Sequence, residues 1–195
     1  MEFKDVVMQR YAAKAFTDRK VPEEKIDELL DLIRFAPSAL NLQPWKVRVI
    51  ADQATRDRLA PAMFGQSQAI RCSHLLVLCA NIDIDDVIAT ADRVMKDAGF
   101  PDERRTQMIG MANNVKANFT ASWAQQQVYL AFANAVNGAK SLGLDSCPMT
   151  GFDPAQVSRI LGLPANLLPT AIVPVGYGAD APVLKARLSR KNLRV

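Results

Sequence analysis

A nearly unbroken apolar run at residues 74–81, HLLVLCAN, sets the strongest limit on what this chain can fold into. It is shorter than the roughly 18 residues that a membrane-spanning helix needs, and no other apolar run reaches that length. Because polar residues do not alternate through it, the run predicts a strand that is covered on both faces. The sheet that contains it therefore needs a layer on each side. A chain of 195 residues is long enough for one domain with such a core.

The segments around this strand show mostly helical periodicity. We predict helices over residues 2–10, 21–36, 52–63, 84–99 and 153–162, and strands over residues 45–51 and 170–178. Asp153 and Gly162 are typical of the first and last caps of the helix that they frame. Pro174 inside the last strand predicts an edge position or a β-bulge. The pattern favours the α+β class, with one domain over residues 1–178 and a basic C-terminal arm over residues 179–195.

Residues 102–142 predict two consecutive helices or one long bent helix. The second half of this stretch is dense in small residues, namely Ala131, Ala133, Ala135, Gly138 and Ala139. Small side chains allow helices to approach one another closely. We therefore expect this part of the chain to form a central buried helix, and an interface position is also open to it.

The N-terminus and the cysteines indicate a cytoplasmic protein with reduced thiols. Residues 1–14 are charged and amphipathic throughout and lack the apolar core of a signal peptide. The three cysteines show no CxxC spacing, and Cys79 lies inside the apolar run, where burial is expected. The single histidine, His74, opens the same run and has no acidic cluster at ligand spacing, so we interpret it as structural and expect no metal site.

The C-terminal arm carries most of the excess positive charge. From residue 181 to 195 there is no acid, whereas five cations are present, namely Lys185, Arg187, Arg190, Lys191 and Arg194. The arm is either a solvated basic tail or part of an anion site. No aromatic residue is interleaved with these cations, which disfavours a nucleic-acid partner.

Common catalytic motifs are missing, which favours chemistry supplied by a cofactor. The chain contains neither a glycine-rich nucleotide loop nor a metalloprotease or nucleophile-elbow motif. Three segments carry groups suited to a phosphorylated ligand: Arg10 with Lys14, Gln66 with Gln68, and Lys185 with Arg187. Residues 147–153, CPMTGFD, offer backbone N–H groups ahead of a helix start. Solvated charges and an ordinary turn explain each segment taken alone.

In this order, the segments resemble those of the FMN-dependent nitroreductase family. The likeness covers nearly the whole chain and rests on RYAAKAF, FAPSALNLQPWKV, FGQSQ, the stretch WAQQQVYLAFANAVNGAKSLGLDSCPMTGFD, and VPVGYG followed by LKARLSRKNL. It implies an α+β sandwich with a mostly antiparallel sheet flanked by helices, and a homodimer in which the C-terminal arm is exchanged. It also implies FMN as cofactor and NAD(P)H as reductant. Hydride would pass through flavin N5 in a ping-pong reaction to a small nitroaromatic or quinone-type acceptor.

The same resemblance implies a set of cofactor-binding positions. They are Arg10, Tyr11, Ala12, Lys14, Pro37, Ser38, Ala39, Asn41, Gln66, Gln68, Pro148, Thr150, Gly151, Lys185 and Arg187. Arg10, Lys185 and Arg187 would hold the FMN phosphate through charge-assisted hydrogen bonds. Lys14 would lie near N1 and the C2 carbonyl, where negative charge accumulates on reduction.

The remaining implied contacts concern the flavin ring. Gln66 and Gln68 would reach the ring edge or the ribityl chain. Residues 37–41 would come from the other subunit. Residues 148–151 would lie against the ring, with a backbone N–H reaching N5, so that no side chain acts as the catalytic group.

Five positions depart from the family's pattern. Tyr11 and Ala12 stand where His and Ser are common, Ala39 replaces a second Ser, and Thr150 stands where an acid is frequent. Gln68 stands where some members carry a second Lys. These changes leave the phosphate cations intact but alter the redox tuning. They motivate a second hypothesis, a flavin-binding storage or redox-sensor protein without turnover.

Overall fold

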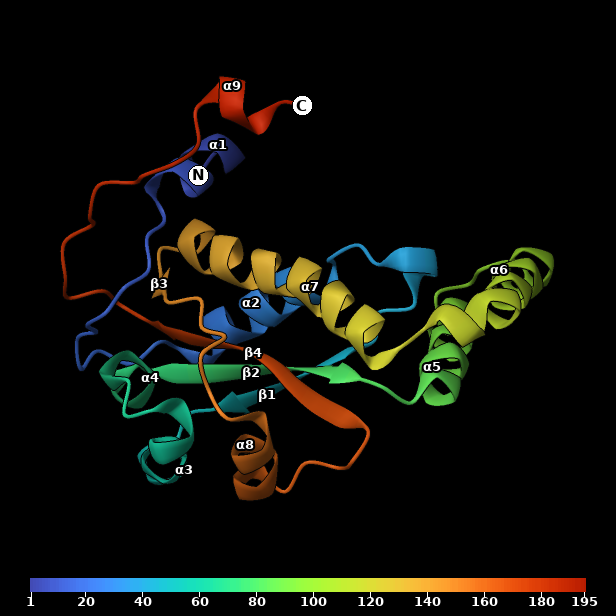
Figure 1. Cartoon of the computed structure of the whole chain (residues 1–195), viewed down its shortest axis with the longest axis horizontal. Coiled ribbons are helices and arrows are strands. Elements are labelled where there is room, and N and C mark those ends of the chain that lie inside the picture. The colour runs from blue at the N-terminus through green and yellow to red at the C-terminus, as the bar shows by residue number, and fades with distance from the viewer.

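The computed structural model describes residues 1–195 and shows a four-stranded antiparallel sheet between layers of helices (Figure 1). The strands are β1 (Trp45–Ile50), β2 (His74–Asn81), β3 (Asp145–Ser146) and β4 (Leu167–Gly176). Their order across the sheet is β1-β2-β4-β3, and every neighbouring pair is antiparallel. The α+β class predicted from the sequence is confirmed.

Helices make up most of the remaining chain. They are α1 (Phe3–Gln9), α2 (Glu23–Arg34), α3 (Gln53–Leu59), α4 (Ser67–Arg71), α5 (Ile84–Asp97), α6 (Asp102–Val115), α7 (Ala121–Ser141), α8 (Pro154–Leu161) and α9 (Arg190–Leu193). Three 3₁₀ turns are also present: η1 (Ala39–Asn41), η2 (Pro61–Met63) and η3 (Lys116–Asn118). The Asp153 side chain accepts the N–H of Gln156 at the start of α8, and Gly162 ends that helix with a left-handed φ, so both predicted caps are confirmed.

Strand β2 is buried along its whole length, as its composition predicts. Leu76 and Leu78 point into a core that they share with α2 and α7. Leu75 and Val77 point the other way, into a core that they share with α3 and α8. The alternation of side chains along one strand thus builds both halves of the sandwich.

Helix α7 crosses one face of the sheet and packs closely against α2 (Figure 1). A Cβ atom at Gly138 would lie 3.0 Å from Leu32 Cδ1 and 3.1 Å from Leu29 Cδ1. The close approach expected from the small residues is therefore present. Between α6 and α7 the chain breaks at η3, and the Thr120 side chain caps α7 by accepting the Trp123 N–H, so two helices form here.

The prediction made from Pro174 is wrong, because β4 lies between β2 and β3 and the irregular register falls elsewhere, opposite Leu78 and Cys79. The Pro174 carbonyl accepts the Cys147 N–H at 3.1 Å. Backbone polar groups of one residue point to the same side of an antiparallel strand, so the missing N–H of Pro174 also faces this side. The two-residue strand β3 ends just before this point, so the lack of an N–H at Pro174 removes only the reciprocal bond to Cys147 beyond the end of β3.

Helices α5 and α6 project from one end of the sandwich (Figure 1). They enclose a small apolar cluster of their own, which Met108 and Phe119 pack against. Phe119 also stacks on Trp123, with ring centroids 4.2 Å apart. These contacts favour a packing role for Met108 and Phe119, whereas Met111 remains exposed. None of the helices is both long and apolar enough to cross a membrane.

The C-terminal arm leaves the sheet after Gly178 and runs along α1 to the short helix α9 (Figure 1). Every residue from 181 to 195 is exposed, including Leu184 at 100% and Leu188 at 70%. Apolar side chains on an extended segment bury nothing within this chain. The arm is therefore held mainly by polar contacts at its base.

Candidate functional site

Residues from the two ends of the chain meet in one pocket of about 200 Å³. It is lined by Arg10, Tyr11, Ala12, Pro148, Val183, Leu184, Lys185 and Arg187. Six of these eight residues belong to the positions implied by the family resemblance, although more than 170 positions separate Arg10 from Lys185 in the chain. The pocket is formed where the segment after α1 passes beneath the arm.

The pocket combines three cations and no acidic side chain. Lys185 Nζ donates to the carbonyls of Val7 and Met8, and Arg187 donates to the carbonyl of Ala186 at 2.7 Å, so neither cation is neutralised by a carboxylate. Partial desolvation, followed by the charges of Arg10 and Arg187, lowers the pKa of Lys185. Crowded cations without counter-ions form a site that favours a dianion such as a phosphate monoester.

A hydrogen-bonded knot ties the segment after α1 to the base of the arm. Asp180 accepts the backbone N–H of Lys14 at 2.9 Å and that of Ala15 at 3.4 Å. The Tyr11 hydroxyl donates to the Asp180 carbonyl at 2.8 Å. Burial, followed by the charges of Asp145 and Asp180, raises the pKa of Tyr11 to about 12. Tyr11 thus faces the arm, and its hydroxyl is already used.

Asp145 in β3 closes the other side of the knot. Its carboxylate accepts the Gly178 N–H at 3.2 Å and pairs with Lys140 at 3.0 Å, and both side chains of the pair are largely buried. Gly178 lies so close to Tyr11 Oη and Asp145 Oδ2 that a Cβ atom has no room there. The knot therefore fixes the distance between Arg10 and the arm cations.

Lys14 lies beside the turn that follows β3. Its Nζ donates to Cys147 Sγ at 3.4 Å, next to the pocket residue Pro148. Cys147 is buried and unpaired, as are Cys72 and Cys79. Burial raises the pKa of the Cys72 thiol to about 11 and that of the Cys79 thiol to about 12, which makes both inert at neutral pH.

A second polar cluster joins the turn before α4 to residues 149–151. Gln66 Nε2 donates to the Gly151 carbonyl at 2.8 Å, and Gln68 Nε2 donates to Gln66 Oε1 at 2.9 Å. The space above Gly151 is open, because a Cβ atom there would meet only Gln66 Nε2, at 3.9 Å. The cluster can present backbone N–H groups to a flat ligand. Gln68 is buried, so it orients Gln66 within the chain.

The loop over residues 37–41 is strained and braced. Leu40 and Asn41 have φ angles of 51° and 53°, and Gln43 follows with 46°, a region that costs a non-glycine residue on the order of 1 kcal/mol or more. Ser38 Oγ accepts the Gln43 N–H at 2.9 Å, and Gln43 Nε2 donates to Asn41 Oδ1 at 3.2 Å. The side chains of Ser38 and Asn41 therefore already support the loop.

This loop lies far from the cation pocket of the same chain. The Ala39 N–H donates to Gln127 Oε1 at 2.9 Å in the first half of α7, whereas α1 packs against the second half, from Asn134 to Ser141. In Figure 1 the loop, in light blue near residue 40, and the red arm lie at opposite ends of α7. One cofactor cannot touch both within a single chain.

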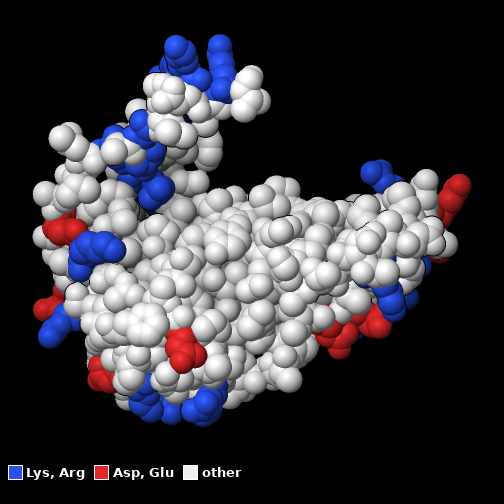
Figure 2. Space-filling model, viewed as in Figure 1, with Lys and Arg blue, Asp and Glu red and all other residues white.

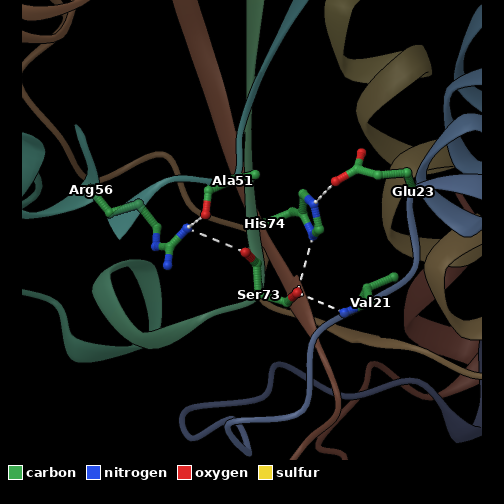
Figure 3. Close-up of polar contacts among 6 residues, drawn as sticks. All are labelled: Val21, Glu23, Ala51, Arg56, Ser73 and His74. Atoms are coloured by element: carbon green, nitrogen blue, oxygen red, sulfur yellow. Dashed lines mark hydrogen bonds and ion pairs between the residues drawn. The ribbon is translucent and has the colours of Figure 1, made fainter. Parts of the chain in front are cut away.

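One line of polar side chains has the composition of a nucleophilic triad. Figure 3 shows His74 between Ser73, whose Oγ lies 3.1 Å from Nδ1, and Glu23, whose Oε1 lies 3.1 Å from Nε2. Ser73 Oγ also accepts the Val21 N–H at 2.8 Å, and Ser73 is only 3% exposed. A substrate cannot reach this hydroxyl. The line instead fastens the start of α2 to β2, in agreement with the structural role expected for His74.

Comparison with known proteins assigns the chain to a family. A model of the nitroreductase family matches residues 7–177, which include all four strands of the sheet and end before Gly178 and the C-terminal arm. The chain belongs to the nitroreductase family. No group of three or more His, Cys, Asp or Glu side chains in it is placed to hold a metal ion.

Relatives and structural neighbours of this nitroreductase-family chain cover almost its whole length. It is 33% identical over 183 residues to a NADH dehydrogenase of Thermus thermophilus, covering 92% of this chain and 88% of the relative. It is 29% identical over 210 residues to the oxygen-insensitive NAD(P)H nitroreductase of Salmonella typhimurium, covering 96% of each. A nitroreductase family protein of Streptococcus pneumoniae has the same fold, with a TM-score of 0.91 at 22% identity, covering 100% of this chain and 99% of that chain. A protein of Exiguobacterium sibiricum in complex with FMN also shares it, with a TM-score of 0.89 at 23% identity and coverage of 100% and 97%.

Sequence reasoning about this nitroreductase-family chain missed three supporting residues. Asp180, Asp145 and Gln127 each fix a segment that carries the implied cofactor positions. Asp180 is the last acid before fifteen residues without one, which is a weak local signal. Asp145 and Gln127 carry no signal of their own, because their partners are distant in the sequence.

Proposed function

We propose that this protein is an FMN-dependent NAD(P)H oxidoreductase that reduces small nitroaromatic or quinone-type acceptors. The observation that carries the proposal is the pocket in which Arg10, Lys185 and Arg187 meet without a carboxylate. FMN ends in a phosphate monoester, and guanidinium and ammonium groups bind such a dianion through charge-assisted hydrogen bonds. The nicotinamide reductant is named by several relatives, among them the Salmonella enzyme.

The residues around this pocket suit the rest of the cofactor. The ribityl chain would pass Ala12 and Pro148, whose small or rigid side chains leave room. The ring would lie over residues 149–151, with Lys14 at the edge where negative charge develops. When bound, FMN would supply the redox chemistry, which is hydride transfer through N5 between NAD(P)H and the acceptor in a ping-pong sequence. The side chains of this protein would bind and orient the cofactor, and the ammonium of Lys14 would stabilise the negative charge that develops on its ring.

We also propose that the working protein is a homodimer with exchanged arms. Helix α7 has no charged residue from Ala121 to Ala139, and it exposes Tyr129 and Leu130. Figure 2 shows the corresponding broad surface without charges between the arm and the α6 end of the molecule. A second copy on this face would bring its residues 37–41 towards the cation pocket and would cover Leu184 and Leu188 of the arm.

Purification and a visible spectrum test the proposal. We expect a yellow protein, or a colourless one that binds FMN in equal amount and melts at a higher temperature with FMN. Anaerobic NADH or NADPH should bleach the flavin, and a quinone or nitroaromatic should restore it. A preparation that binds no FMN contradicts the proposal. Bound FMN that neither nicotinamide can bleach supports the storage or sensor hypothesis instead.

The phosphate site is tested separately with charge variants. Arg187→Gln should weaken FMN binding roughly 10- to 100-fold, because a hydrogen bond to a charged group contributes about 1.5–3 kcal/mol. Lys191→Gln is the matched control, since Lys191 lies on the same arm outside the pocket. Equal losses in both variants would show that general positive charge, and not this pocket, attracts the ligand.

Sedimentation of the full chain and of a chain ending at residue 180 tests arm exchange, which predicts a weaker dimer for the shorter chain.

A further inference from the structure

Asp180 is the last residue whose own backbone position is fixed before the arm runs free. Its carboxylate accepts the backbone N–H of Lys14 at 2.9 Å and that of Ala15 at 3.4 Å, and its carbonyl accepts the Tyr11 hydroxyl at 2.8 Å. No backbone–backbone hydrogen bond joins residues 181–195 to the rest of the chain. The direction in which the arm leaves the body of the protein is therefore set at Asp180.

Beyond Asp180, the hydrogen bonds from the arm to the rest of the chain come from Lys185, whose Nζ donates to the carbonyls of Val7 and Met8. Lys185 also lines the cation pocket, so these carbonyls compete with an anion for its ammonium. The hydrogen bonds of Asp180 use none of the three pocket cations. Lys185 follows Asp180 by five positions, a length of chain that spans at most about 18 Å. Asp180 thus keeps the arm cations near Arg10 without drawing on the groups that would bind a ligand.

The segment that precedes Lys14 has anchors of its own. The Ala13 N–H donates to the Ser146 carbonyl at 3.1 Å, and Ala12 forms a parallel β-bridge with Ser146. Neither contact involves Asp180. Loss of the Asp180 carboxylate should therefore free the arm more than the positions along which the ribityl chain and the ring would lie.

Charge alone would give Asp180 the opposite effect on an anion. A carboxylate repels a phosphate, so removal of an acid near the pocket would tighten phosphate binding if charge were all that mattered. Anchoring of the arm predicts the reverse. Without the anchor, the cations are assembled in only a fraction of the molecules, and the apparent affinity falls by that fraction. The direction of the change therefore separates the two roles.

We propose that Asp180 is a positioning residue through which the cation pocket favours a phosphorylated flavin over an unphosphorylated one. The inference rests on the proposed FMN function and adds a residue that does not itself line the pocket. Because Asp180 holds the start of the arm, Lys185 and Arg187 already lie beside Arg10 when the ligand arrives, and less free energy is lost in ordering them. Riboflavin has the same ring and ribityl chain without the phosphate, so its binding does not depend on the arm cations.

Titration of the full chain, freed of any bound flavin, with FMN and with riboflavin tests the proposal through the change in flavin fluorescence. Wild type should bind FMN at least about 100-fold more tightly than riboflavin, since three cations line the pocket. Asp180→Ala should reduce this preference roughly 3- to 10-fold by weakening FMN binding, because the arm cations are then assembled in only part of the molecules. Asp180→Asn keeps one acceptor oxygen and should reduce the preference by a smaller factor, which keeps the test decisive if the alanine variant does not fold.

Asp18→Ala is the matched control. Asp18 is exposed, follows Lys14 by four positions, and makes no side-chain hydrogen bond or ion pair. The change therefore removes the same charge from this part of the chain without removing an anchor. The Asp18→Ala variant should keep the wild-type preference for FMN over riboflavin.

The outcomes separate this inference from the proposed function. Tighter FMN binding by both Asp180 variants would show that the carboxylate acts by repulsion alone, which overturns the inference. An equal loss of affinity for FMN and riboflavin, with a lower melting temperature, marks a purely structural residue and overturns it too. A wild-type preference that survives in both variants overturns the role of Asp180 and leaves the proposed function intact. Equal binding of the two flavins by wild type, or binding of neither, contradicts the phosphate site and the proposed function together.

Discussion

A double-mutant cycle on Tyr11 and Gly178 tests the knot at the base of the arm. In the structure a Cβ atom on Gly178 would overlap Tyr11 Oη and would lie 2.9 Å from Asp145 Oδ2. Gly178→Ala therefore forces the phenol away from the Asp180 carbonyl. We expect overpacking of about 1–3 kcal/mol, offset by about 0.4–1 kcal/mol from the loss of glycine flexibility in the unfolded chain.

The companion change removes the obstacle. Tyr11→Phe deletes the oxygen atom that the new Cβ would overlap, at a cost of about 1 kcal/mol for one partly buried hydrogen bond. In the Tyr11→Phe background, Gly178→Ala should then cost almost nothing beyond its contact with Asp145. The two changes together should destabilise the fold by about 1 kcal/mol less than the sum of the single changes, a difference larger than independent sites show.

Urea unfolding of the four proteins, followed by circular dichroism, measures this coupling. Gly110→Ala is the control, because Gly110 lies inside α6 and a Cβ atom there meets nothing within 4 Å. Gly110→Ala should stabilise the protein by roughly 0.5–1 kcal/mol in either background. If the costs of Tyr11→Phe and Gly178→Ala simply add, the steric reasoning about the knot is refuted.

Three further outcomes follow from buried groups. Arg56→Leu should lower the free energy of unfolding by about 3 kcal/mol, because the fully buried guanidinium donates to the backbone carbonyls of Ile70, Ala51 and Ser73, which would lose their partner. Figure 3 shows the bonds to Ala51 and Ser73. Urea unfolding against the exposed control Arg58→Leu measures this, and a loss below that of the control contradicts it. The folded-state pKa of Tyr11 is raised to about 12 from an ordinary value near 10, so the unfolded phenol loses its proton first and stability falls as pH rises from about 10 to 12. The stability advantage of wild type over Tyr11→Phe should shrink across that interval, and parallel curves would rule the assignment out. Gly138→Ala should destabilise the α2–α7 contact by about 1 kcal/mol, since its Cβ would press on two leucine side chains, and an unchanged melting temperature would disprove the close packing.

Local pattern was sufficient to predict most of the fold. The strand at residues 74–81, the caps at Asp153 and Gly162, and the small residues of α7 each carry their structural reason within a few positions. Pro174 misled the prediction because the rule that places proline at an edge depends on the neighbouring strand, and a sequence does not show that β3 ends after two residues.

The candidate site could be predicted only in part. The resemblance named Arg10, Lys185 and Arg187 as one set, and the structure brings them into one pocket. Residues that hold such a set in place are harder to find, because Asp180 and Asp145 act through backbone N–H groups that every residue type except proline offers. Gln127 is equally hard to find, because the role of its side chain depends on a hydrogen bond to a loop residue 88 positions away in the sequence.

The meeting of Arg10 and Arg187 also has a consequence for the synthesis of the protein. Arg187 is synthesised long after Arg10, and at about 5–20 residues per second the interval between them is roughly 10–35 s. During that time the sheet, α2 and α7 can form, but the anion pocket cannot. A nascent chain of this protein is therefore folded without its ligand site until Arg187 has been synthesised, and ligand binding begins only after that point.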